Sequence, residues 1–170
     1  MANGISRRTD RQIIPIAFTV NGVQYDIEVE PHELLLDVIR ERLGLTGVKR
    51  SCDVQVCGAC TLLLNGRPVS SCTLPAFEAS GREILTIEGL ATNGKLHPLQ
   101  EAFIEHGGFQ CGFCTPGMIL TAKVLLEEKP DPSHEEIVHF MHGNICRCTG
   151  YKKIIESIVA AAKTMRASAA

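Results

Sequence analysis

Residues 109–117 read Phe-Gln-Cys-Gly-Phe-Cys-Thr-Pro-Gly, and residues 144–151 repeat the arrangement as Asn-Ile-Cys-Arg-Cys-Thr-Gly-Tyr. Each segment offers two thiols on a tight loop and is followed at once by residues that start helices. Thr115 can cap a helix and Pro116 suits a first helical position, while Thr149 repeats this pattern more loosely. Two helix N-termini would then direct unpaired N–H groups and positive dipole ends toward one point between the sulfurs. The two segments therefore predict a site for an anionic group.

The composition is that of a globular protein of one domain or two small ones, with 45% hydrophobic and 21% charged residues in a chain of 170. The net charge of −2 gives no reason to expect nucleic acid or an anionic membrane surface as a partner. No apolar run approaches the length that inserts into a membrane. Arg7-Arg8 resembles a twin-arginine signal only faintly, because the apolar run that follows contains Pro15. We therefore expect a cytoplasmic protein.

The first half of the chain, residues 15–88, alternates predicted strands with one predicted helix. Asn21-Gly22 and Asn65-Gly66 are strong hairpin signals, because both turn positions favour positive φ. A hairpin, a helix across it and further strands are typical of a β-grasp domain, and residues 1–14 are expected to be a disordered tail. The expected elements are strands over 16–20 and 23–29, a helix over 34–43 that stops at Gly44, and strands over 61–64, 68–72 and 84–87.

The second half, residues 89–166, is predicted to be all-α, with four helices. Pro130 and Pro132 prevent the second helix from continuing, and Ser133 with Glu136 forms a capping box for the third. From Ala167 onward the chain is expected to fray. The expected helices cover 99–106, 115–127, 135–141 and 152–165. The overall class is therefore α+β.

All eight cysteines fall into two sets of four. The first set has the spacing C-x4-C-x2-C with a distant fourth cysteine, which is the plant-type ferredoxin pattern. The second set joins C-x2-C to C-x-C, and the C-x-C pair is unusual in structural zinc sites. Four thiolates around a [2Fe–2S] core carry a net charge of roughly −2, which suits the predicted anion site. The predicted ligands are Cys52, Cys57, Cys60 and Cys72 for one [2Fe–2S] cluster, and Cys111, Cys114, Cys146 and Cys148 for another.

Other interpretations of these residues remain open at this point. Free thiols also permit a disulfide scaffold, although such scaffolds belong mainly to secreted proteins, and C-x2-C alone would justify a zinc-stabilised interaction module. His139 and His142 form an H-x2-H pair, but both sets already supply four sulfurs, so we expect all histidines to be surface or packing residues. Gln110 either caps its loop or offers its amide to a cofactor in another subunit.

Three motifs together resemble one family. Residues 51–61, 110–118 and 144–151 are similar, in this order, to the iron–sulfur (small) subunit of the xanthine oxidase family of molybdenum hydroxylases, which includes the small subunit of carbon monoxide dehydrogenase. The resemblance covers residues 16–163. One departure lies between the first two cysteines, where many members have glycines and this chain has Asp53, Val54, Gln55 and Val56.

The resemblance implies a plant-type ferredoxin-like domain followed by a four-helix [2Fe–2S]-binding domain. It implies a large partner subunit that binds a molybdopterin-type molybdenum cofactor, and a medium partner subunit that binds FAD. By this analogy Gln110 and Cys148 contact the molybdopterin, and the first cluster faces the flavin. The chain would be a non-catalytic electron-transfer subunit of an oxidoreductase; the alternative is a free-standing two-cluster ferredoxin that shuttles electrons between enzymes.

Overall fold

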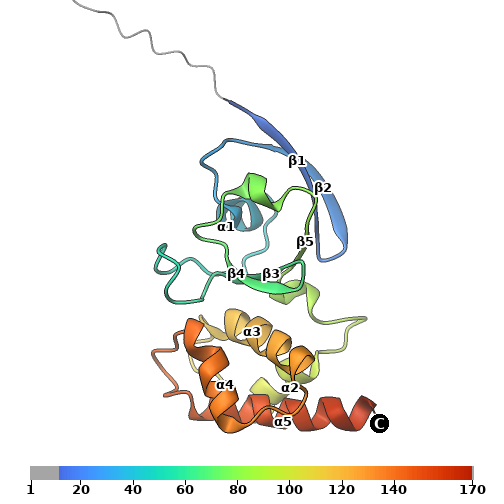
Figure 1. Ribbon diagram of the computed structural model, residues 1–170, viewed down its shortest axis with the longest axis vertical. Helices are drawn as coiled ribbons and strands as arrows, with labels where there is room; N and C mark the ends of the chain where they lie inside the picture. The colour runs from blue at the N-terminus through green and yellow to red at the C-terminus, as the bar shows by residue number, and fades with distance from the viewer. Residues whose placement is uncertain (1–11, 170) are drawn as a thin grey trace, which may run out of the picture.

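The computed structural model describes residues 12–169. One part of the molecule contains the strands and α1, and the other contains α2, α3, α4 and α5 (Figure 1). The predicted α+β class, with a mixed sheet preceding the helices, is therefore confirmed. The predicted tail falls mainly on residues 1–11, which lie outside the described residues, and its last residue, Ile14, already belongs to the first strand.

The sheet has five strands in the order β2-β1-β5-β3-β4. Its only parallel pair within the described residues joins β1 to β5, while β1 with β2, β3 with β4 and β3 with β5 are antiparallel. Short 3₁₀ turns, η2 (Ala76–Ala79) and η3 (Ile87–Gly89), flank β5. The strands are β1 (Ile14–Val20), β2 (Val23–Val29), β3 (Thr61–Leu64), β4 (Arg67–Ser70) and β5 (Glu83–Leu85).

Both predicted hairpin turns are present. Asn21 and Gly22 have φ of 51° and 81°, and Asn65 and Gly66 have φ of 49° and 77°, the left-handed values that a tight hairpin requires. The strand bounds differ slightly from those predicted. Strand β1 begins at Ile14 rather than at residue 16, because Pro15 is accommodated in the strand, where it pairs with Glu28 of β2. The return strand β4 ends at Ser70. The prediction that Cys72 lies at the end of this strand is therefore wrong.

The predicted helix over 34–43 is only partly α-helical. It consists of α1 (Leu35–Asp37) followed by η1 (Val38–Arg42), a π-helical turn in which the Leu43 N–H donates to the Val38 carbonyl at 3.1 Å. Apolar periodicity cannot distinguish this wider turn from an α-helix, because the buried residues still fall on one side. The element ends as predicted before Gly44, whose φ is 72°.

Four α-helices occur in the second part, close to the predicted positions. They are α2 (Pro98–Glu105), α3 (Thr115–Glu128), α4 (His134–Phe140) with a 3₁₀ extension η4 (Met141–Gly143), and α5 (Lys152–Ala169). The capping box of Ser133 and Glu136 is present. The expected fraying from Ala167 is wrong for the described residues, since α5 continues to Ala169. None of the helices within residues 12–169 is long and apolar enough to cross a membrane.

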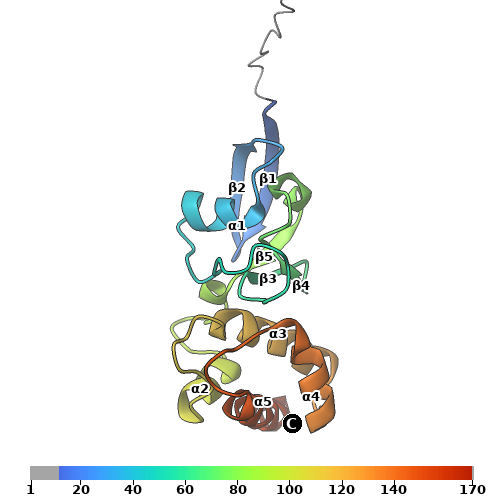
Figure 2. The same cartoon turned by 90° about the vertical axis from the view of Figure 1, so that its left-hand side faces the viewer.

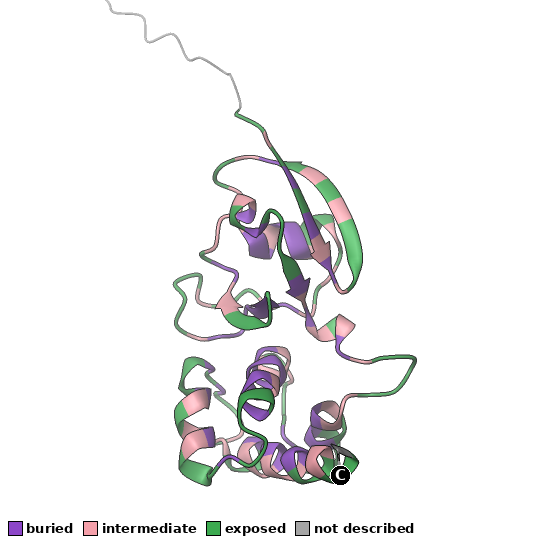
Figure 3. Ribbon diagram, turned by 45° about the vertical axis from the view of Figure 1, so that its right-hand side comes forward, coloured by how far each residue is buried: buried purple, intermediate pink, exposed green. Residues whose placement is uncertain are grey.

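Helix α3 lies between the sheet and the other helices in both views (Figures 1 and 2). It is largely buried (Figure 3), because Leu120 and Val124 pack against Leu63 of β3 while other residues of α3 join the helical core. A separate core of Leu35, Ile39 and strand residues fills the space between the sheet and α1. The central helix thus fixes the position of the helical part relative to the sheet.

His97 caps the N-terminus of α2. Its Nδ1 accepts from the Leu99 N–H at 3.2 Å, and Gln100 completes a capping box by accepting from the His97 N–H. Burial lowers the pKa of His97, and Lys123 lowers it further. The cap needs an unprotonated Nδ1, so the neutral imidazole is the form that stabilises the helix.

We predict that stability will depend on pH through His97. Because the folded-state pKa lies below the unfolded value of about 6.5, the contribution of His97 is complete above that pH and is lost as pH falls through the folded-state pKa. In His97→Asn, which caps without titrating, the melting temperature measured between pH 7.5 and 5.5 should fall less steeply than in the native protein. His32→Asn, at an exposed histidine, is the control. Equal slopes in all three proteins would contradict the prediction.

Candidate metal centres

The first cysteine set begins in the loop that follows Lys49 and Arg50. The Cys52 thiol accepts from the N–H groups of Val56 at 3.4 Å and Cys57 at 3.5 Å. The N–H of Val54, followed by those of Cys57 and Val56, lowers the pKa of Cys52 to about 6. Backbone donors therefore already favour the thiolate at this position, as a metal ligand requires.

The other members of this set come from the end of the loop and from the segment after β4. Cys60 and Cys72 are both buried. Burial, and then contact with the Cys60 thiol, raises the pKa of Cys72 to about 11, and Cys52 adds a smaller repulsion. Ser71 holds the two segments together, since its hydroxyl donates to the Cys60 carbonyl at 2.7 Å. The structure thus brings Cys72 to Cys52 and Cys60 although it lies beyond the strand.

The loop between Cys52 and Cys57 has an unusual backbone. Asp53 and Gln55 have φ of 53° and 59°, in the left-handed region that favours glycine. Both side chains are bonded: Asp53 accepts from Arg50 at 3.0 Å, and Gln55 Oε1 accepts from the Thr73 hydroxyl at 3.1 Å. Arg50 also pairs with Asp37 of α1. The sequence indicated the loop but gave no sign of these bonds.

The second set combines exposed and buried thiols. Cys111 and Cys148 are exposed, with their sulfurs 3.6 Å apart, and Cys114 contacts Cys146. Burial, and then the Cys146 thiol, raises the pKa of Cys114 to about 12; contact with Cys111 raises the pKa of Cys148. The two predicted segments therefore meet at one place.

Cys146 is the member of this set whose thiolate is best stabilised. Burial alone would raise its pKa, but the hydroxyl and N–H of Thr149, which lie 3.1 and 3.4 Å from its sulfur, outweigh burial and lower the pKa. The Cys146 N–H donates to the Tyr151 hydroxyl, which donates in turn to the Asn144 carbonyl. Thr149 thus acts on the sulfur directly. The threonine that directly follows the C-x-C pair was the available signal for this role.

The predicted capping role of Thr115 is wrong. The residue that caps α3 is Cys114, without a side-chain hydrogen bond, and the Thr115 hydroxyl is buried without a partner among the described residues. Pro116 does lie in the first turn, as predicted. The Thr115 hydroxyl is thus a buried donor that the described residues leave without an acceptor.

The two cysteine sets are joined by direct hydrogen bonds. The Ile145 N–H, one residue before Cys146, donates to the Cys57 carbonyl at 2.8 Å. The buried amide of Asn144 donates to the Gly58 carbonyl at 3.1 Å and lies 3.4 Å from the Thr61 hydroxyl oxygen. The backbones are so close that a Cβ on Gly117 would overlap the Gly58 carbonyl oxygen. Sequence reasoning did not anticipate this junction.

A small apolar cleft of about 270 Å³ lies where the two sets approach each other. It is lined by cysteines of both sets together with Phe113, Ile145 and Arg147. Phe113 and Ile145 are exposed, as is Phe109 nearby. Gln110 is also exposed next to Cys111, and no hydrogen bond involves its side chain among those found in the described residues. The second set therefore opens onto an apolar surface.

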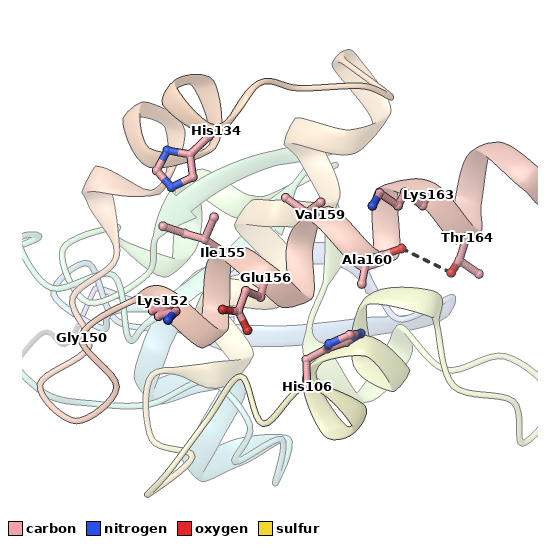
Figure 4. Close-up of a pocket in the computed structure, with 10 residues that line it drawn as sticks. All are labelled: His106, His134, Gly150, Lys152, Ile155, Glu156, Val159, Ala160, Lys163 and Thr164. Atoms are coloured by element: carbon pink, nitrogen blue, oxygen red, sulfur yellow. Dashed lines mark hydrogen bonds between the residues drawn. The ribbon is translucent and has the colours of Figure 1, made fainter.

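A larger surface hollow, of about 900 Å³, lies elsewhere, along α5 (Figure 4). It contains no cysteine, and the only hydrogen bond drawn within it joins the Thr164 hydroxyl to the Ala160 carbonyl. The predicted histidine pair, His139 and His142, makes an edge-on ring contact at 5.6 Å outside this hollow. The residues that line the hollow are His106, His134, Gly150, Lys152, Ile155, Glu156, Val159, Ala160, Lys163 and Thr164.

The donor chemistry of both sets fits a [2Fe–2S] cluster. Each set contains one thiol with a lowered pKa and at least one with a raised pKa. Burial is the larger cause of the raised pKa of Cys72 and Cys114, and the neighbouring sulfurs add to it through contact and charge repulsion. Bound ferric iron would offset this repulsion, and N–H groups aimed at sulfur suit a ligated thiolate. Within residues 12–169 no three His, Cys, Asp or Glu side chains are grouped as a single metal ion would require. The thiols instead contact one another in pairs, such as Cys111 with Cys148 and Cys114 with Cys146.

Comparison with known proteins gives consistent matches along the chain. Residues 18–86 match the family model described as a 2Fe-2S iron-sulfur cluster binding domain, and residues 86–159 match the [2Fe-2S] binding domain. The chain is 52% identical to the nicotinate dehydrogenase small FeS subunit of Eubacterium barkeri, over 83% of this chain and 90% of that one. It is 46% identical to the aldehyde oxidoreductase of Megalodesulfovibrio gigas over 88% of its own length, but covers only 17% of that longer protein.

A solved structure, quinoline 2-oxidoreductase from Pseudomonas putida 86, superimposes with a TM-score of 0.88. The sequences are 46% identical, and the match covers 92% of this chain and 98% of that one. Likeness in sequence and in fold therefore extends over both cysteine sets.

We predict that Asn144→Asp will destabilise the junction between the two sets. The change removes the amide donor and places a carboxylate next to the Gly58 carbonyl, so the free energy of unfolding should fall by about 1–3 kcal/mol. Thermal unfolding of the metal-loaded protein measures the loss. Asn93→Asp, at an exposed turn, is the matched control and should change stability by less than about 0.5 kcal/mol. A melting temperature for Asn144→Asp as high as that of the control would refute the role of this amide.

Proposed function

The chain belongs to the iron–sulfur subunits of the xanthine oxidase family of molybdenum hydroxylases, and on this basis we propose that it conducts electrons from a molybdopterin site in a large subunit to FAD in a medium subunit. The chain itself would bind no substrate and catalyse no reaction. We propose that residues 15–88 form a plant-type ferredoxin-like domain and residues 89–166 a four-helix cluster domain. The thiol ligands suit a reducing compartment, and we propose that the complex is cytoplasmic.

Each cysteine set is proposed to hold one [2Fe–2S] cluster, which when bound accepts and passes on single electrons. Cys52, Cys57, Cys60 and Cys72 are the proposed ligands of the first cluster. Cys111, Cys114, Cys146 and Cys148 are those of the second. The contribution of the protein is to orient N–H groups toward Cys52 and Cys146 and to bury Cys60 and Cys72.

The observation that carries the proposal is the hydrogen bond between the sets. The Ile145 N–H and the Cys57 carbonyl join a proposed ligand of the first cluster to the neighbour of Cys146, a proposed ligand of the second. This bond supports a short route of covalent and hydrogen bonds from one set to the other. An interaction module stabilised by zinc would have no need of such a link.

The two ends of this route differ in exposure, which supports a direction. Cys148 and Gln110 lie at the exposed apolar surface with Phe109 and Phe113. We propose that this surface is covered by the large subunit, that Cys148 and the Gln110 amide contact the molybdopterin, and that the first set lies toward the flavin.

We predict that Cys148→Ser will block electron flow without preventing assembly. Loss of one ligand should remove the second cluster, so iron should fall from about four to about two atoms per chain, and turnover with an external electron acceptor should stop. The partner subunits should still co-purify, because Ser differs from Cys by one atom and the apolar residues of this surface, Phe109 and Phe113, are unchanged. Ile104→Ala, at an exposed apolar side chain of α2, is the control for surface changes. Full turnover in a Cys148→Ser complex shown to lack that cluster would overturn the proposal.

Natively expressed protein should elute from gel filtration together with two larger chains. A lone small brown protein would instead indicate a free-standing ferredoxin. A colourless protein with zinc would exclude both, since zinc thiolates do not absorb visible light.

A further inference from the structure

Two residues of the first cysteine loop have a conformation that their side chains do not favour. Asp53 and Gln55 are the non-glycine residues with positive φ between Cys52 and Cys57, where glycine would carry less strain. Both are bonded through their side chains to segments outside the loop, Asp53 to Arg50 and Gln55 to Thr73. The strained conformation is therefore held by hydrogen bonds on two sides.

Packing does not hold this loop in place. Val54 and Val56, the apolar residues on either side of Gln55, are 64% and 60% exposed. Because they bury little surface, the core contributes little to the conformation of the loop. The conformation is held by hydrogen bonds instead: those of the backbone to the Cys52 sulfur, and those of the Asp53 and Gln55 side chains.

The conformation of the loop decides where its N–H groups point. The N–H groups of Val56 and Cys57 are directed at the Cys52 sulfur, and the Gln55 N–H faces the Cys72 thiol. Thr73, the partner of the Gln55 side chain, directly follows Cys72. The Thr73–Gln55 hydrogen bond thus connects the middle of the first cysteine loop with the segment that supplies Cys72, while Ser71 connects the same segment with Cys60 at the end of the loop.

We propose that Gln55 and Thr73 form a positioning pair, a clasp that closes the first cysteine loop over its cluster and protects that cluster from solvent. The inference rests on the proposed function, since it requires a [2Fe–2S] cluster at Cys52, Cys57, Cys60 and Cys72. It gives a role to a glutamine whose backbone conformation, with φ of 59°, favours glycine. The strain of a left-handed glutamine is offset by a bond that glycine cannot make.

The test uses the purified complex and substitutions on both sides of the clasp. Thr73→Val removes the hydroxyl donor at constant shape, Gln55→Ala removes the acceptor, and Thr73→Ser restores a donor. The readout is the rate at which a chelator bleaches the visible absorbance of the first cluster. The EPR signal of that cluster is assigned by its absence in Cys72→Ser.

Thr73→Val and Gln55→Ala should each accelerate loss of the first cluster by about fivefold, the factor that corresponds to one ordinary hydrogen bond. The double variant should be no faster than either single one, because both changes break the same bond. Thr73→Ser should keep the native rate, and the EPR signal of the second cluster should not change. Gln24→Ala is the matched control, since Gln24 also makes an exposed side-chain hydrogen bond, to Asp26 of β2, away from the cysteines.

The outcomes separate the clasp from the proposed function. Native complex without two [2Fe–2S] signals would defeat the proposed function. Two normal signals with equal bleaching rates in Thr73→Val, Gln55→Ala and Gln24→Ala would defeat the clasp alone. Additive effects in the double variant would also defeat it, because the two side chains would then act independently.

Discussion

Thiols that must be deprotonated to bind a metal are held close together in this chain, in two separate sets. Burial raises the pKa of Cys72 and Cys114, and contact with Cys111 raises the pKa of Cys148, so proximity of the thiols is costly before a metal is bound. The fold counters this cost with donors. Loop N–H groups point at Cys52, and Thr149 supplies an N–H and a hydroxyl to Cys146. Sheet and helices serve mainly to hold these donors in position.

Donors are directed at cysteine sulfurs in both sets, but the two sets are supported by different secondary-structure elements. In the first set, a strained loop and the segment after β4 are tied by Ser71 and by the Gln55–Thr73 bond. In the second, the loops before α3 and α5 meet, and Tyr151 braces the backbone of Cys146. Helix α3 contacts both the sheet and the helical core, so it keeps the two frameworks in one fixed relation. Electron transfer between them needs such a fixed relation more than it needs flexibility.

The sequence predicted the hairpins, the strand β2 and the helices well, because Asn-Gly turns, capping boxes and proline breaks act locally. It did not predict the π turn at Val38–Arg42, since the apolar pattern is the same for both helix types. The grouping of cysteines into two sets was predicted from their spacing, and the structure shows contacts between pairs of thiols within each set, such as Cys111 with Cys148 and Cys60 with Cys72. The bonds of Asn144 to Gly58 and of Thr73 to Gln55 could not be predicted, because they span 86 and 18 residues and depend on the finished packing.

Gly117 lies in the first turn of α3, where its missing side chain lets the helix rest on the Gly58 carbonyl. The absence of a side chain at Gly117 therefore sets how closely the two halves of the molecule approach each other. The rate of electron tunnelling falls off exponentially with separation. A methyl group at this point would therefore slow electron transfer between the two proposed clusters. The rate of the proposed electron transfer would then depend on a residue that is not one of the proposed ligands.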